Sequence, residues 1–168
     1  LFDGIPHVTD ATSHLFQAKI FAAGRMWAPA PACPDAFWQP HVLITHSGKW
    51  FTKYTPGHAL LLAAGIKLGL LKWVLPLCLL IVVVSLGRLL EAYEGRSAAR
   101  VGMVLLATSP LALLLGGSFM SHVSAMAGSA AGVLCWTRFF AADSPRKGRF
   151  WAAAGGFLLA ASALTRPH

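Results

Sequence analysis

The sequence predicts an all-α fold, namely a polytopic membrane helical bundle with an extracytoplasmic loop that carries juxtamembrane amphipathic helices. Three observations predict this fold class. The chain is 56% hydrophobic and only 12% charged, whereas soluble domains contain roughly 25% charged residues. No Asp, Glu, Lys or Arg lies between Val101 and Thr137, a stretch long enough for two bilayer crossings of about 20 residues each. Basic residues stand at the ends of the apolar segments, where long side chains can reach the membrane interface.

We expect residues 1–168 to be a single fragment of one membrane domain. Residues 1–56 are predicted to form an extracytoplasmic loop with a short helix, residues 57–71 a re-entrant or interfacial helix, and residues 72–168 about four transmembrane helices. The predicted spans are residues 73–90, two segments within 101–137, and 150–165. The chain begins with Leu and stops at the end of an apolar segment, so we expect a fragment of a longer membrane protein with segments missing on both sides.

The distribution of charge predicts the orientation of these spans. Two connections are basic, and the connection between them, residues 116–124, has no charge. The basic residues are Arg88, Arg96 and Arg100 in the first connection and Arg138, Arg146, Lys147 and Arg149 in the second. Because Lys and Arg concentrate in cytoplasmic loops, residues 116–124 and 1–56 are expected on the outer side. A net charge of +8 does not indicate nucleic-acid binding here, because the basic residues are not interleaved with aromatic residues on one face.

The outer loop is predicted to contain an amphipathic helix over residues 10–25. Leu15, Phe16 and Ile20 recur at the spacing of one helical face. Asp10 or Thr12 is a suitable N-cap residue for this helix. The three cysteines are widely separated in the chain, which indicates neither a disulfide framework nor a zinc site.

Three short motifs follow one another along the chain. They are Asp10-Ala11 before "TSHLFQAKIFAAGRMWAPAP", the run "KYTPGH" from Lys53 to His58, and Arg166 with a proline in the terminal "LTRPH". In order and spacing they resemble the GT-C glycosyltransferases, polytopic enzymes that include protein O-mannosyltransferases and lipid A aminoarabinose transferases. That family commonly has Asp-Glu before an amphipathic helix and a Tyr-Pro-Pro-Gly-like turn before a second one. Here Ala11 stands in place of the Glu, and Thr55 in place of the first Pro.

The resemblance implies transfer of a sugar from a polyprenyl-phosphate-linked donor to an unknown glycan, lipid or protein acceptor on the extracytoplasmic face. This reaction needs a carboxylate that deprotonates the acceptor and cations that stabilise the leaving phosphate. Asp10 is the candidate base, and its alternative role is the helix N-cap. Lys53 and Arg166 are the candidate phosphate ligands, and their alternative role is interfacial snorkelling.

The motifs contain further candidates for substrate binding. Tyr54 and His58 belong to the second motif, and His58 is expected either to hydrogen-bond a phosphate or to be structural. His122 has the same two alternatives. Asp3 is either a second carboxylate of the site or part of a turn with Gly4.

The sequence is also compatible with metal binding and with two rival functions. The spacing of His7, Asp10 and His14 leaves a divalent metal ion open, although no residue is assigned to a metal site. A transporter or flippase would carry charged residues within its spans, and the predicted spans carry almost none. A catalytically inactive membrane subunit stays open because of Ala11.

Overall fold

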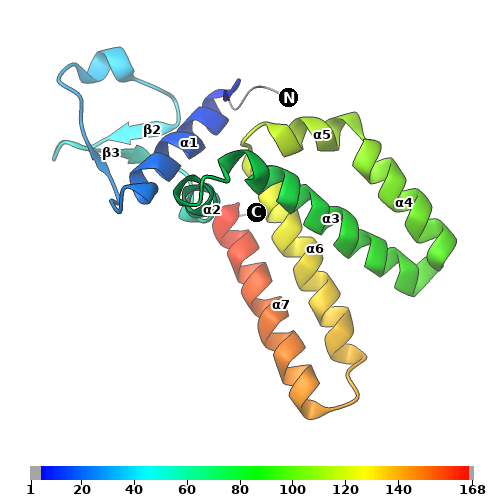
Figure 1. The fold of residues 1–168 in the computed structure, drawn as a ribbon. Coiled ribbons are helices and arrows are strands. Elements are labelled where there is room, and N and C mark those ends of the chain that lie inside the picture. The colour runs from blue at the N-terminus through cyan, green and yellow to red at the C-terminus, as the bar shows by residue number, and fades with distance from the viewer. Residues whose placement is uncertain (1–4, 167–168) are drawn as a thin grey trace.

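In the computed structural model, which describes residues 5–166, a small sheet and one helix form one end of the molecule, and helical hairpins extend from it (Figure 1). The helices and strands are α1 (Thr9–Ala22), β1 (Ala28–Pro29), the 3-10 helix η2 (Pro34–Phe37), β2 (Val42–Ile44), β3 (Lys49–Thr52), α2 (Pro56–Lys67), α3 (Leu71–Glu94), α4 (Arg96–Thr108), α5 (Pro110–Gly117), α6 (Ser121–Phe140) and α7 (Pro145–Thr165).

The all-α prediction is wrong for the segment between α1 and α2, which forms a three-stranded antiparallel sheet in the order β1-β3-β2. Strands of two to four residues are too short to be stable without a packing partner. Gln17 of α1 supplies part of that support: its Oε1 accepts the Thr52 N–H at 3.0 Å, and its Nε2 donates to the Met26 carbonyl at 3.1 Å. The buried Gln17 side chain therefore connects α1 both to β3 and to the loop before β1.

The helix α1 packs with α2 around a buried apolar cluster. The cluster contains Ala11, Ala18, Leu62, Ala63, Leu75 and Phe119. The buried face of α1 runs through Ala11, His14 and Ala18, whereas the predicted stripe included Leu15 and Phe16. Small side chains on this face allow α2 to approach α1 closely. α2 begins with a proline in its first turn, a position that proline favours because its missing N–H needs no partner there.

The prediction of a polytopic bundle with about four spans is wrong. Among residues 5–166, only α3 is by itself long and apolar enough to cross a membrane. α4 and α5 meet the same criterion only when taken together, and they are bent by 55° at Ser109 and Pro110. α6 and α7 are long, but Ala, Gly and Ser replace larger apolar residues along them. By length and composition one helix could therefore span a membrane, and no multi-pass topology follows.

The small residues of α6 and α7 serve close packing between these two helices. A Cβ atom at Gly128 would lie 3.0 Å from the Leu158 carbonyl oxygen. The Ser162 hydroxyl lies 2.8 Å from the Ala125 carbonyl oxygen and 2.8 Å from the Ser129 hydroxyl. This antiparallel packing brings the last turn of α7 to the first turn of α6, beside α2 (Figure 1).

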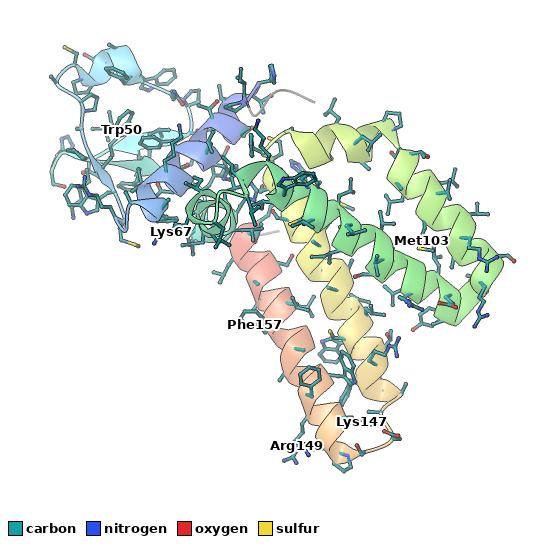
Figure 2. All side chains as sticks on the ribbon, in the orientation of Figure 1. Trp50, Lys67, Met103, Lys147, Arg149 and Phe157 are labelled. Atoms are coloured by element: carbon teal, nitrogen blue, oxygen red, sulfur yellow. The ribbon has the colours of Figure 1, made fainter. Side chains whose placement is uncertain are left out.

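The outer face of the hairpins is rich in exposed apolar side chains. Phe157 of α7 is 74% exposed and Leu80 of α3 is 57% exposed. Figure 2 shows Lys147 and Arg149 at the α6–α7 turn, at the end of this hairpin that lies far from Trp50 in the sheet. The opposite end of the hairpin, where α6 begins, carries the uncharged α5–α6 turn and lies next to α1 and α2 (Figure 1).

Candidate functional site

A polar pocket of about 330 Å³ lies where α1, the start of α2, the α5–α6 turn and the end of α7 meet. Its lining residues are Asp10, His14, Lys53, Tyr54, Thr55, Met120, Ser121, His122, Thr165 and Arg166. Five residues singled out from the sequence, Asp10, Lys53, Tyr54, His122 and Arg166, therefore line one cavity although they come from four distant parts of the chain. Asp3 lies outside the described residues.

Asp10 faces this pocket from the first turn of α1. The Tyr54 hydroxyl donates a hydrogen bond to its Oδ1, and His41 Nε2 lies 3.3 Å from the same oxygen. The N-cap position of α1 is Val8, without a side-chain cap, so the alternative role of Asp10 as N-cap residue is wrong. A carboxylate in the first turn still interacts favourably with the helix dipole, but its partners belong to the pocket.

The two candidate phosphate ligands line the pocket from different elements. Lys53 follows β3 and is exposed, and its Nζ lies 5.6 Å from the centre of the Tyr54 ring. Arg166 is the C-cap residue of α7, and its backbone N–H bonds the Ser162 carbonyl at 3.0 Å. Burial lowers the pKa of His122, the nearby Arg166 guanidinium lowers it further, and Asp10 acts in the opposite direction. Charges from three chain segments thus act on one small volume.

His14 lies on the buried wall of the pocket. It is 3% exposed, its ring stacks on Tyr54 with centroids 4.6 Å apart, and its edge meets His58 at 4.8 Å. Burial, followed by the neighbouring His58, His122 and His41, lowers the pKa of His14 to about 3. Its Nδ1 is buried without a hydrogen-bond partner. The ring is therefore neutral near pH 7 and presents an unsatisfied polar atom beside the cavity.

His58 does not line the pocket, although the second motif made it a substrate-binding candidate. It is fully buried behind the pocket wall, where Nδ1 lies 2.8 Å from the Ser124 hydroxyl and Nε2 lies 2.9 Å from the Phe119 carbonyl oxygen. Burial lowers its pKa to about 4. The structural alternative for His58 thus agrees with its position.

Sequence reasoning missed the contact of His41 with Asp10 and the place of His14 in the pocket wall. His14 follows Asp10 by four residues, so helical spacing could have placed both on one face of α1. No local signal pointed to His41, because it reaches Asp10 only through the fold of the sheet. Within residues 5–166, no group of three or more His, Cys, Asp or Glu side chains is arranged to hold a metal ion.

Comparisons of this chain with protein-family models, with curated proteins and with solved structures found no match.

Proposed function

We propose that this pocket is the active site of a glycosyltransferase that moves a sugar from a polyprenyl-phosphate-linked donor to an acceptor on the extracytoplasmic face of a membrane. The observation that carries the proposal is the presence of Asp10 in one cavity with the cations Lys53 and Arg166. Transfer from a phosphate-linked sugar needs both functions within one small volume, a base for the acceptor hydroxyl and positive charge for the leaving phosphate.

Asp10 is the general base in this proposal. The Tyr54 hydroxyl and His41 hold one carboxylate oxygen, Oδ1. The second oxygen has no bond to either group, so it is available to accept the proton of an acceptor hydroxyl. Such orientation matters because a base acts only within hydrogen-bond distance of the proton it removes.

The leaving phosphate is assigned to the side of the pocket formed by Arg166, Lys53 and the start of α6. An Arg guanidinium can make two parallel bonds to a phosphate. The N-cap residue of α6, Met120, provides no side-chain cap, so the first N–H groups of this helix have no cap partner and favour an anion. Two cations and a helix N-terminus together supply the positive potential that a phosphate requires.

In this proposal the polyprenyl chain is assigned to an apolar groove next to the α5–α6 turn. A groove of about 430 Å³ between α3 and α5 is lined mainly by apolar residues and reaches Phe119, which directly precedes Met120 of the polar pocket. Lys72 is the one charged residue of its lining, which contains no carboxylate and no imidazole. An apolar groove next to a cationic pocket suits a ligand with a phosphate head and a hydrocarbon tail.

Ala11 supports the inactive-subunit alternative less than the sequence suggested. It is fully buried in the cluster between α1 and α2. A Glu side chain at this position would be directed at apolar neighbours, where an unpaired charge is costly. The absence of a second carboxylate is therefore consistent with this packing, and Asp10 alone supplies the base.

The test uses the intact protein in proteoliposomes and measures release of polyprenyl phosphate from labelled polyprenyl-phosphate sugars. Asp10→Asn is expected to lower turnover about 100-fold or more, the scale of a lost general base. Asp35→Asn, an exposed acid in η2 outside the pocket, is the matched control and should retain activity. Full activity of Asp10→Asn would contradict the assignment, and a wild type that is inactive on every donor would favour the transporter or inactive-subunit alternative.

A further inference from the structure

We propose that His58 is a positioning residue whose bond to the Phe119 carbonyl holds the α5–α6 turn in the conformation that forms one wall of the pocket. The inference deepens the proposed function and rests on it for the identity of the site. His58 is not one of the lining residues of the pocket. Its effect on the pocket is through the lining residues that it orients.

The two ring nitrogens of His58 have different partners, and this defines the tautomer. The Phe119 carbonyl oxygen can only accept, so Nε2 carries the hydrogen and donates at 2.9 Å. In the neutral ring Nδ1 is then an acceptor, and the Ser124 hydroxyl is its donor at 2.8 Å. The Ser124 hydroxyl is also within donor distance, 2.9 Å, of the carbonyl oxygen of Ser121, a residue that lines the pocket, so its single hydrogen is shared between His58 Nδ1 and that carbonyl. His58 thus contacts the turn and the first turn of α6 at once.

The α5–α6 turn has a backbone conformation that needs such support. Phe119 has a φ of +53°, and it is the one non-glycine residue with positive φ among the described residues. L-residues with a bulky side chain disfavour this left-handed region, and they occupy it only where the surroundings hold them there. Two contacts do so here: the Phe119 ring is buried in the cluster shared with α1 and α2, and His58 binds its carbonyl oxygen.

The conformation of Phe119 sets the direction of the residues that follow it. Met120, Ser121 and His122 come next in the chain, and all three line the pocket. A turn that relaxed toward negative φ at Phe119 would rotate the start of α6, and with it the wall that faces Arg166. Displacement of a positioned group by about 1 Å can cost about 100-fold in rate, so a bond outside the pocket can matter for chemistry inside it.

Neighbouring residues show that the start of α2 connects several pocket walls. Tyr54 bonds Asp10 on α1, Thr55 Oγ1 donates to the Thr165 carbonyl at 3.3 Å, and Gly57 packs against the Leu164 backbone of α7. His58 contacts the remaining wall, because its Nδ1 is hydrogen-bonded to Ser124 of α6. The short run from Tyr54 to His58 therefore contacts three helices that contribute residues to the pocket.

Three substitutions of His58 distinguish its bond to the Phe119 carbonyl from its bond to the Ser124 hydroxyl. His58→Gln places an amide N–H near the position of Nε2 and retains a donor for Phe119. His58→Asn reaches only as far as Nδ1 and loses that donor, and His58→Leu loses both bonds. The control is Ser162→Ala, which removes the contacts of the Ser162 hydroxyl with the Ala125 carbonyl and the Ser129 hydroxyl of α6 and has no contact with Phe119.

Amide hydrogen exchange in residues 117–125 and donor turnover are the two measurements. We expect His58→Asn and His58→Leu to exchange about 10-fold faster there and to lose about 10-fold or more in turnover, with His58→Gln close to wild type in both. Ser162→Ala should leave exchange in residues 117–122 unchanged even if its melting temperature falls as much as that of His58→Leu.

The proposal is overturned if His58→Asn and His58→Leu exchange and turn over like wild type, or if His58→Gln is as impaired as His58→Leu. A wild type without turnover would reject the proposed function alone, because the exchange pattern would still decide whether His58 holds the turn.

Discussion

The two ends of the molecule are built on different chemistry. The end formed by α1, the sheet and the start of α2 buries polar side chains that have hydrogen-bond partners, among them Ser13, Gln17 and His58. The far parts of the helical hairpins bury mostly small residues and expose large apolar ones such as Phe157. Buried polar groups require defined partners, whereas contacts between small apolar residues require only close approach. The polar end can therefore form a reactive pocket, and the hairpins supply support and an apolar surface.

The largest expected effect is a loss of stability in acid, and it arises at the polar end. The pKa values of His14 and His58 are lowered to about 3 and about 4 from 6.5, so the unfolded chain binds protons at a higher pH than the folded one. The two neutral rings contribute their full stabilisation above pH 6.5, the pKa in the unfolded chain. This stabilisation decreases as the pH falls toward their pKa values in the folded protein. We expect a loss of roughly 3 kcal/mol or more between pH 7 and pH 4, since one pKa unit corresponds to about 1.4 kcal/mol.

Thermal unfolding in detergent across this pH range measures the effect. In His58→Gln the dependence on pH should become shallower, because one of the two titrating rings is gone and His14 also loses its imidazole neighbour. Equal slopes for the variant and the wild type would show that other groups cause the acid sensitivity.

The next largest effect is expected where the polar end meets the hairpins. A Cβ at Gly57 would lie 2.7 Å from backbone atoms of Leu164 and Thr165, and backbone atoms cannot move aside as a flexible side chain can. Gly57→Ala is therefore expected to lower the free energy of unfolding by about 1–3 kcal/mol and to widen the pocket. Gly156→Ala is the comparison, because no atom lies within 4 Å of its added Cβ.

Denaturant titration distinguishes the two glycine variants. Gly156→Ala should gain up to about 1 kcal/mol from helix propensity. If Gly57→Ala also gained stability, α2 and α7 would have to be less tightly packed than this contact indicates.

The smallest effect is expected on the exposed face of the hairpins. Phe157 is 74% exposed, so Phe157→Ala in detergent should change the free energy of unfolding by less than about 0.5 kcal/mol. The fully buried Leu62 of α2 provides the contrast, and Leu62→Ala should cost about 2–5 kcal/mol. Similar losses in both variants would mean that the Phe157 face is covered by protein in solution.

Several local features could be read directly from the sequence. The proline and glycine at 56 and 57 mark the start of α2, and the spacing of apolar residues after Asp10 indicates a helix there. The composition showed that long apolar surfaces would occur, and α3 has the length and hydropathy of a membrane span. These features depend on residues close to one another in the chain, so they need no knowledge of the fold.

Other features were missed or wrongly predicted because they depend on distant residues. The strands are short and are supported by Gln17, which lies 35 residues before Thr52 in the chain. The charge-free stretch from Val101 to Thr137 predicted two spans, yet it bends by 55° between α4 and α5. Its second half forms α6, whose glycines permit close approach to α7.

The sequence by itself determined the apolar character of the chain, the positions of α1 and α2, and the set of charged residues available for chemistry. Only the tertiary structure decided that Asp10, Tyr54 and Arg166 share one pocket, and that His58 lies behind its wall with Phe119 as a partner. The physical reason is that helix starts and hydrophobicity arise from neighbouring residues. Side-chain partners and the protonation of buried rings arise from contacts between segments far apart in the chain.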